Sequence, residues 1–388
     1  MSELSEKTFG GGTPKTSNDS FWKGNIPWIQ SSDLAEGSLF DVEPRKYISQ
    51  EAVDKSATKL VPEKSVAIVT RVGVGKLAFM PFSYATSQDF LSLSVLKTEP
   101  QFTVYALYKK LQSELNDVQG TSIKGVTKDE LLAKEVMIPC YKEQEKIGSY
   151  LHSLDHLITL HQRKCDETKK LKKFMLQKMF PKKDAKKPEI RFAGFTDDWE
   201  QRKLGDICSR VQGNDGRMEL PTLTISAANG WMKQEDRFSG NIAGKEQTNY
   251  TLLHKGELSY NHGNSKLAKY GTVFSLQTYE EALVPRVYHS FKVENESADF
   301  IEYYFATKIP DRELRKLISS GARMDGLLNI GYDDFMGIKM MFPSASEQDK
   351  IAEYFRALDH IITLHQRKCD ELKEFKKYML QNMFPQKG

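Results

Sequence analysis

A 39-residue segment that occurs twice is the feature that most limits how this chain can fold. Residues 143–181 and 347–385 are identical at 27 positions and lie at a constant offset of 204 residues. A repeat of this length usually reflects a repeated structural unit. We therefore expect two units of the same general architecture, each of which ends in one copy of the segment.

Both copies have the pattern of a long helix with one narrow apolar face. Apolar side chains recur at steps of three and four residues, and each copy ends at a Phe-Pro pair, where proline stops a helix. This spacing favours a coiled coil in which the two copies pair antiparallel about a pseudo-twofold axis, over two ordinary amphipathic helices packed on separate domains. The predicted seam comprises Ile147, Leu151, Leu154, Ile158, His161, Cys165, Thr168, Leu171, Met175 and Met179, with Ile351, Phe355, Leu358, Ile362, His365, Cys369, Leu372, Phe375, Met379 and Met383.

Composition sets only broad limits. The chain has 388 residues, enough for two domains with cores, and a net charge of only +4. Residues 163–187 hold eleven Lys or Arg against three acids, which suits either a surface near phosphates or a solvated helix face. The four cysteines form no CxxC pair, and neither a signal peptide nor a membrane-length apolar run is present. We expect a cytoplasmic protein.

The repeat predicts how the chain is divided. Each copy follows a domain that opens with a Gly-rich stretch, continues with short strands and a helix, and closes with an apolar run and a proline. The predicted class is α+β, with two domains joined by two long helices. The expected segments are a first domain at 1–140, a first helix at 141–181, a linker at 182–198, a second domain at 199–343 and a second helix at 344–388.

Hydrophobic runs between turn residues locate the elements within each domain. The closing apolar runs, Glu135–Pro139 and Ile338–Pro343, are expected to be equivalent strands. Other expected strands are Ser65–Arg71, Lys76–Met80, Phe90–Val95, Thr222–Ser226, Glu257–Tyr260, Thr272–Ser275 and Arg286–Phe291, with helices at Val104–Leu115, Asp299–Thr307 and Asp311–Ile318.

The search for catalytic motifs gives no convincing active site. The glycines before Lys76 do not form a phosphate-binding loop, because Thr70 and Leu77 stand where the motif needs Gly and Ser or Thr. His161 and Cys165 have the i, i+4 spacing of metal ligands, but polar residues that fix the register of a coiled-coil seam are the favoured interpretation. We expect neither a catalytic residue nor a metal site.

Binding loops are the remaining source of function. Several loops between predicted strands carry Arg, Lys, Asn, Gln and aromatic side chains, which can contact base edges and phosphates of duplex DNA. The candidate contacts are Lys15, Arg71, Lys76 and Gln88 in the first domain, and Arg217, Asn261, Lys266, Lys269 and Arg323 in the second.

The repeated motif EQ[ED]KI…LDH[LI]ITLHQRKCDE…[KN]MFP, together with PEIRFAGFTDDWEQRKLGDI at 188–207, resembles the specificity (S) subunit of type I restriction-modification systems. The resemblance covers essentially the whole chain. It implies that each domain is a target-recognition domain that reads one half of a split target in double-stranded DNA. It also implies that the paired helices set the gap between the half-sites and bind two methyltransferase (M) subunits, which motor-nuclease (R) subunits join.

On this resemblance the chain is non-catalytic and confers specificity on a DNA adenine methyltransferase and restriction endonuclease complex. Cofactors are then expected only in the partner subunits, which would use S-adenosylmethionine, ATP and Mg. The competing hypotheses are a coiled-coil scaffold that joins two protein-binding modules and a self-contained restriction enzyme. Binding to DNA through several phosphates should weaken steeply with salt, which separates it from a protein scaffold.

One departure from the family pattern concerns the start of the first domain. Leu4 is expected to align with Leu204, so residues 188–203 have no counterpart ahead of the first domain. This segment carries Phe192, Phe195 and Trp199, which we expect to pack on a helix or on a partner.

Overall fold

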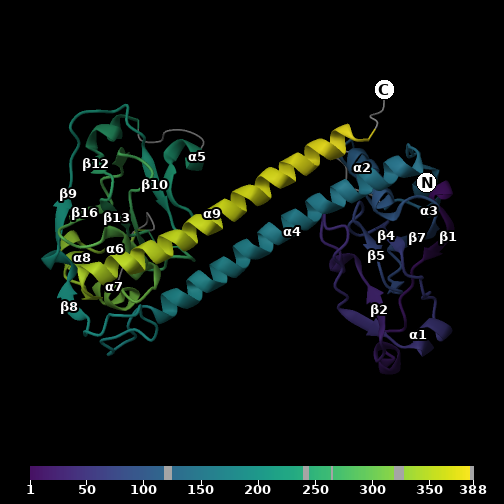
Figure 1. Ribbon diagram of the computed structural model, residues 1–388, viewed down its shortest axis with the longest axis horizontal. Helices are drawn as coiled ribbons and strands as arrows, with labels where there is room; N and C mark the ends of the chain where they lie inside the picture. The colour runs from purple at the N-terminus through teal and green to yellow at the C-terminus, as the bar shows by residue number, and fades with distance from the viewer. Residues whose placement is uncertain (118–124, 239–243, 264, 319–326, 385–388) are drawn as a thin grey trace. The chain divides into compact units, whose positions relative to one another are not determined.

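The computed structural model describes residues 1–117, 125–238, 244–263, 265–318 and 327–384. The chain divides into two compact units: unit 1 comprises Met1–Arg163 and Gln366–Gly388, and unit 2 comprises Lys164–His365. The repeated segments form helices α4 (Tyr141–Lys178) and α9 (Ala345–Asn382). Each is one continuous helix (Figure 1), and the division between the units at residues 163–164 and 365–366 falls within both helices. Each unit therefore holds the start of one long helix and the end of the other.

Unit 1 is built on a four-stranded antiparallel sheet with the strand order β1-β7-β4-β5. Alternate residues of β4 face opposite sides: Val66 and Ile68 pack with α2 and the long-helix ends, and Ala67 and Val69 pack toward a second sheet, β3-β2-β6. The elements are η1 (Ser2–Leu4), β1 (Ser5–Gly10), η2 (Asp19–Trp22), β2 (Ile26–Ile29), η3 (Ser31–Asp33), β3 (Lys46–Ile48), α1 (Gln50–Lys55), β4 (Ser65–Val69), β5 (Leu77–Met80), β6 (Ala85–Thr86), β7 (Phe90–Leu96), α2 (Pro100–Asp117) and α3 (Lys128–Ala133).

Unit 2 has a corresponding four-stranded antiparallel sheet, β14-β13-β16-β9, and the pairs β10-β11, β12-β15 and β17-β8. Its largest core cluster joins this sheet to α6, α8 and the long-helix ends. The elements are β8 (Glu200–Lys203), η4 (Leu204–Asp206), β9 (Cys208–Val211), β10 (Leu223–Ser226), β11 (Gly230–Lys233), α5 (Gln234–Phe238), η5 (Gly244–Asn249), β12 (Thr251–His254), β13 (Leu258–Asn261), β14 (Thr272–Ser275), β15 (Glu281–Val284), β16 (His289–Val293), α6 (Ala298–Ala306), α7 (Asp311–Leu317), α8 (Tyr332–Met336) and β17 (Lys339–Phe342).

The mixed helix and sheet content agrees with the α+β prediction. Strands β4, β5, β7, β10, β13, β14 and β16 and helices α2, α6 and α7 overlap the predicted ranges. The prediction that Glu135–Pro139 forms a strand was wrong, whereas Ile338–Pro343 contains β17. Strand β17 pairs along its length with β8, and the described part of unit 1 has no strand in the position of β8. An extended segment without a hydrogen-bonding neighbour cannot form a ladder.

The predicted alignment of Leu4 with Leu204 was wrong by three residues. The Leu204 N–H donates to Ile338 O, and the amino group of Met1 donates to Lys134 O, the residue 204 positions before Ile338. Met1 therefore takes the place of Leu204, and Leu4 takes the place of Ile207. The predicted packing of the lead-in aromatics is confirmed: Trp199 contacts Phe180 and Phe300, Phe192 contacts Tyr354, and Phe195 lies under the Lys350 ammonium.

The long-helix ends make the same polar contacts in both units. In unit 1, the Asp155 carboxylate accepts a hydrogen bond from the Tyr105 hydroxyl and pairs with the Lys376 ammonium. In unit 2, the Asp359 carboxylate accepts from the Tyr303 hydroxyl at 2.9 Å and pairs with Lys172 at 2.6 Å. Burial, with the adjacent carboxylate, raises the pKa of both tyrosines. A Tyr–Asp–Lys triad thus fixes each pair of helix ends.

These triads correct two positions of the predicted seam. Leu171 is 45% exposed and Phe375 is 43% exposed, whereas Lys376 is buried. Lys172 and Lys376 occupy the seam positions that the apolar pattern assigned to Leu171 and Phe375. Their charge is tolerated there because each ammonium is paired with an aspartate and lies over a tyrosine ring, at 5.2 Å from Tyr303 and 5.3 Å from Tyr105.

The triad of unit 1 can be tested by removing its carboxylate. Asp155→Ala leaves the Lys376 ammonium and the Tyr105 hydroxyl without their partner, and we expect the free energy of unfolding to fall by about 2–3 kcal/mol. Chemical denaturation followed by circular dichroism measures the change. Asp370→Ala, at an exposed position of α9 in the same unit, is the control and should change the free energy by less than about 0.5 kcal/mol. Equal effects of the two substitutions would contradict the role of the triad.

Candidate nucleic-acid interface

Unit 1 carries a surface hollow of about 910 Å³ in which aromatic and basic side chains meet. The rings of Trp22 and Trp28 pack edge to face at 4.9 Å, and the Lys46 ammonium lies 5.7 Å from both ring centroids. The hollow is lined by Thr13, Thr16, Asp19, Trp22, Lys23, Gly24, Trp28, Gln30, Ser31, Ser32, Arg45, Lys46, Tyr47, Ser87, Gln88 and Asp89.

The local sequence explains this arrangement. Strands β2 and β3 pair antiparallel with Trp28 opposite Lys46, so the two side chains share one face. The Trp28 indole N–H donates to the carbonyl of Gly12 at 3.0 Å. A Cβ at Gly12 would lie within 2.7 Å of the backbone at Ala57 and Thr58, so only glycine lets the chain approach closely enough for this bond.

The rim of the hollow offers polar groups to a ligand. The side chain of Asp33 is buried, accepts from the Gln30 N–H at 2.8 Å and pairs with Arg45 at 3.6 Å. The Arg45 side chain is anchored by this contact but remains 71% exposed. With the nearby Lys23 and Lys46, it gives the hollow a positive edge suited to phosphates.

The four predicted DNA contacts of unit 1 differ in exposure and in their distance along the chain from the hollow. Gln88 is exposed and lines the hollow, and Lys15 is an exposed neighbour of the lining residues Thr13 and Thr16. Arg71 is also exposed. Lys76 is partly buried, and its ammonium donates to Leu34 O at 2.9 Å, so its side chain supports a loop.

The predicted contacts of unit 2 do not gather in one described hollow. Lys266 and Lys269 are exposed in the loop that follows β13. The Asn261 side chain forms hydrogen bonds within unit 2. Its amide N–H donates to Ile225 O at 3.2 Å, and its amide oxygen accepts from the Gly263 N–H at 3.0 Å. Arg323 lies outside the described residues.

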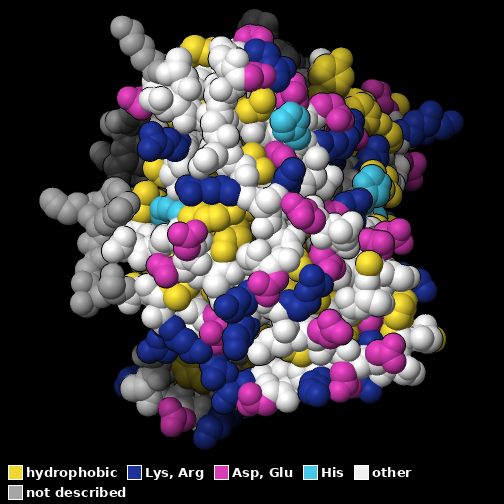
Figure 2. All heavy atoms as spheres, turned by 90° about the vertical axis from the view of Figure 1, so that its left-hand side faces the viewer, with side chains coloured by type: hydrophobic (Ala, Val, Ile, Leu, Met, Phe, Trp, Pro, Cys, Tyr) yellow, Lys and Arg dark blue, Asp and Glu magenta, His cyan; other side chains and the backbone are white. Residues whose placement is uncertain are grey.

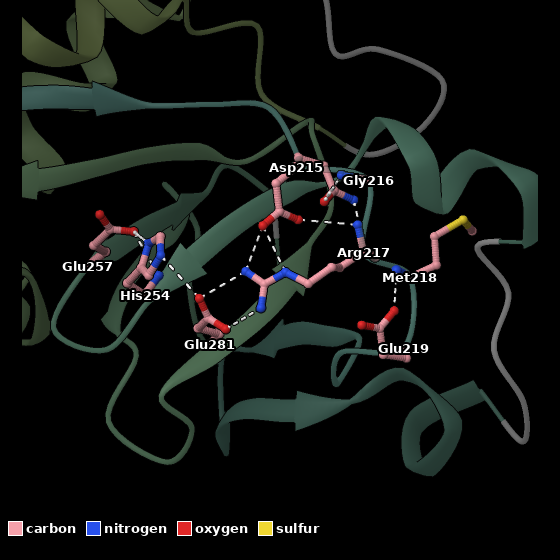
Figure 3. Close-up of polar contacts among 9 residues, drawn as sticks. Asp215, Gly216, Arg217, Met218, Glu219, His254, Glu257 and Glu281 are labelled. Carbon is pink, nitrogen blue, oxygen red and sulfur yellow. Dashed lines mark hydrogen bonds and ion pairs between the residues drawn. The ribbon is translucent and has the colours of Figure 1, made fainter.

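Arg217 is held by carboxylates of its own unit, as Figure 3 shows. Its guanidinium makes two hydrogen bonds to Glu281, at 2.6 and 3.0 Å, and one to Asp215 at 2.8 Å. Glu281 also faces His254 at 3.4 Å. The hydrogen bonds from Arg217 lower the pKa of Glu281. A phosphate at Arg217 would have to compete with both carboxylates.

The basic stretch at 163–187 is also partly neutralised within unit 2. Lys178 and Lys182 pair with Glu189, and Lys187 pairs with Asp198 at 3.3 Å. On the face shown in Figure 2, basic and acidic side chains alternate over most of the surface, and Lys and Arg crowd together only toward the lower edge. Part of the basic excess in this stretch is therefore engaged in ion pairs with neighbouring carboxylates.

Sequence reasoning missed Arg45 and Lys46, which the structure places in the hollow. The signal was weak, because Arg45 follows Pro44 and Lys46 begins a strand of only three residues, away from the tryptophans in sequence. It also missed the Tyr–Asp–Lys triads. Their signal is in the repeat itself, since an aspartate and a lysine recur at the same positions and each domain has a matching tyrosine, Tyr105 or Tyr303.

Metal binding and membrane insertion find no support in the described residues. Within the described ranges, no group of three or more His, Cys, Asp or Glu side chains has an arrangement that could hold a metal ion. The seam cysteines contact backbone carbonyls instead, Cys165 at Ile362 O and Cys369 at Ile158 O. None of the helices described is both long and apolar enough to span a membrane.

Comparison with known proteins identifies relatives of both units. The family described as "Type I restriction modification DNA specificity domain" matches residues 1–170 and 196–374. The MjaIX specificity subunit of Methanocaldococcus jannaschii, a type I restriction enzyme subunit, is 27% identical over 219 residues, which are 53% of this chain and 50% of the relative. The EcoR124I/EcoR124II specificity subunit of Escherichia coli is 30% identical over 162 residues, 39% of each chain. The matches thus span half or less of these relatives.

The crystal structure of a type I restriction-modification S subunit from M. genitalium is similar in fold, with a TM-score of 0.61 at 13% identity. The similarity covers 98% of this chain and 94% of that one. The resemblance predicted from the repeated motif is confirmed by these matches. Because the family's domain is matched once in each unit and over most of the residues, this chain belongs to the type I restriction-modification DNA specificity domain family.

Proposed function

We propose that the chain is the DNA-recognition subunit of a type I restriction-modification complex, in which each unit reads one half of a split duplex target. The proposal rests on one observation. The two units share one set of contacts to the long helices, but their loops differ in sequence. Besides the triads, Gln144 binds Pro139 O and the Glu99 N–H, as Gln348 binds Pro343 O and the Ser297 N–H. A shared frame with different loops suits a protein that reads two sequences.

The proposed domains are 1–140 and 199–343, with residues 141–181 and 344–388 as spacer helices and 182–198 as the linker. Within unit 1, Asp155 contacts Lys376 and Ile158 contacts Cys369, so residue numbers rise along α4 as they fall along α9. The pairs of unit 2 show the same opposite order. These contacts support an antiparallel coiled coil with pseudo-twofold symmetry.

Both units also expose apolar side chains on the long helices, at equivalent positions. Such side chains cost solvation free energy when they stay in water, and several on one helix face favour a protein partner. We propose that they bind one methyltransferase subunit per unit, which would supply the S-adenosylmethionine chemistry, with motor-nuclease subunits joining this core. They are Leu157, Leu160, Phe375 and Tyr378 in unit 1, and Ile361, Leu364, Leu171 and Phe174 in unit 2.

For DNA contact in unit 1, we propose the hollow around Trp22, with Gln88 reading a base edge and Lys15, Arg45, Lys46 and Arg71 near phosphates. In unit 2 the remaining candidates are Lys266 and Lys269. Exposed lysines beside aromatic rings are suited to the backbone of a duplex, and an amide such as that of Gln88 can pair with adenine.

Salt-dependent binding tests this surface. Lys46→Ala in the assembled complex is expected to weaken binding to every duplex alike and to reduce the slope of log affinity against log salt by about 0.9 for the lost phosphate contact. Gln88→Ala should instead relax one base position by about 1–3 kcal/mol. Fluorescence anisotropy with labelled duplexes at several NaCl concentrations measures both. Lys128→Ala, an exposed lysine of α3, is the control. An unchanged slope for Lys46→Ala would remove the hollow from the proposed interface.

A further inference from the structure

Unit 1 has an open apolar groove of about 510 Å³ beside the start of α4. Two aromatic rings, Phe102 and Phe384, stack at 5.5 Å in its wall. Met137 and Ile138 are 68% and 44% exposed, although both are large and apolar. The groove is lined by Phe102, Met137, Ile138, Pro139, Glu143, Ile147, Gln381, Asn382, Met383 and Phe384.

The equivalent place in unit 2 is filled by the chain's own lead-in, residues 188–203. The Trp199 ring packs against Phe180 at 6.1 Å and Phe300 at 5.7 Å, and these are the counterparts of Phe384 and Phe102. The side chain of Trp199 is buried by these contacts. Strand β8 then pairs with β17, and this leaves Phe342 only 2% exposed where Ile138 stands in unit 1.

An ion pair fixes the other end of the lead-in. The Arg191 guanidinium binds both oxygens of Glu347, at 2.6 and 2.7 Å, and donates to Asp197 O at 2.7 Å. Glu347 is buried by this contact. Its counterpart in the repeat, Glu143, is exposed at the edge of the open groove. The described part of unit 1 holds no segment that plays the role of 188–203.

We propose that the unit 1 groove is a peptide-binding site for a segment with the chemistry of residues 188–203. The segment would place an arginine on Glu143 and, eight residues later, a tryptophan against Phe102 and Phe384. The residues after the tryptophan would add as a strand beside 135–138, as β8 does beside β17. Three features of the groove select this peptide chemistry: its negative edge at Glu143, its aromatic wall and its unpaired extended segment.

The match between the two sites has one informative difference. Tyr304, whose hydroxyl accepts from the Met341 N–H at 3.2 Å, is replaced in unit 1 by Ala106. The smaller side chain leaves more room beside the segment 135–138. The groove is therefore expected to accept tryptophan without strain. The proposal does not depend on DNA binding, because every residue that it uses lies on α2, α4 and the segments that flank the long helices.

A synthetic peptide provides the test. The probe is a fluorescently labelled peptide of residues 186–203, titrated with the full chain and followed by anisotropy. Saturable binding is expected, and Glu143→Ala should weaken it by about tenfold or more, since it removes both hydrogen bonds to the arginine. Glu145→Ala, an exposed carboxylate two residues further along α4, should leave the affinity unchanged.

Exchanging the two charges between the groove and the peptide distinguishes the loss of a specific ion pair from misfolding of the variant chain. Glu143→Arg should abolish binding of the natural peptide, and a peptide with Arg191→Glu should restore it. Two results would overturn the proposal. One is the absence of saturable binding to the natural chain. The other is binding that is lost in Glu347→Ala but not in Glu143→Ala, which would mean that the peptide exchanges with the lead-in of unit 2.

Discussion

Deletion of seven residues from each long helix is expected to shorten the unread gap of the DNA target by about three base pairs and to leave both half-sites unchanged. Residues 161–167 and 365–371 have the same sequence, so their removal treats both helices alike, and it leaves the apolar side chains proposed to bind methyltransferase subunits in place. Seven residues contribute about 10 Å of helix, the length of about three base pairs. A seven-residue deletion also preserves the phase of the seam. Both Tyr–Asp–Lys triads lie outside the deleted segments.

The expected change is a qualitative one, because a duplex with the original gap should no longer be methylated. Mapping of modified adenines in cells that express each variant with methyltransferase subunits measures it. A variant of unchanged length, Arg163→Ala with Arg367→Ala, is the control and should retain the original gap. Altered half-sites with an unchanged gap would show that the helices do not set the distance.

Trp199→Ala is expected to cost unit 2 about 3–5 kcal/mol of its free energy of unfolding, because it leaves a cavity between Phe180 and Phe300. The loss is a large fraction of the stability of a typical domain. In target mapping, the half-site read by unit 2 should then disappear while that of unit 1 is retained. Differential scanning calorimetry resolves the weakened unit as a transition at lower temperature.

Two matched variants sharpen this prediction. Trp199→Phe should cost much less, because the indole N–H has no hydrogen-bond partner among the described residues and only the volume of the ring matters. Phe174→Ala removes an aromatic ring that is nearly half exposed on α4 of the same unit, and it should leave stability almost unchanged. If Trp199→Ala were as mild as Phe174→Ala, the lead-in would not support unit 2.

The sequence was sufficient to predict the two long helices because the repeat is long and nearly identical. The α+β class and about half of the described strands followed from hydrophobic periodicity, since a strand such as Ser65–Val69 is buried along its whole length and apolar after its first residue. The predicted seam includes side chains that are buried in the structure, such as those of Leu151, Cys165 and Phe355. It failed at Leu171 and Phe375, because a buried lysine that is paired with aspartate looks like a surface residue in the sequence.

The candidate site was less predictable, for physical reasons. Arg217 is basic and lies in a glycine-containing loop, but only the fold shows that Asp215 and Glu281 bind its guanidinium. Lys46 reaches the hollow through a cross-strand pair whose register depends on the whole sheet. The failure of the predicted strand at 135–139 has the same origin, since pairing depends on a neighbour that the local sequence does not specify.

Target mapping tests the central claim most directly. The measurement is a genome-wide map of methylated adenines in cells that carry the methyltransferase subunits, with and without this chain. The account predicts that a split motif, two short half-sites separated by a fixed gap, appears only when the chain is present. The same methylation pattern with and without the chain, or a single uninterrupted motif, would contradict it.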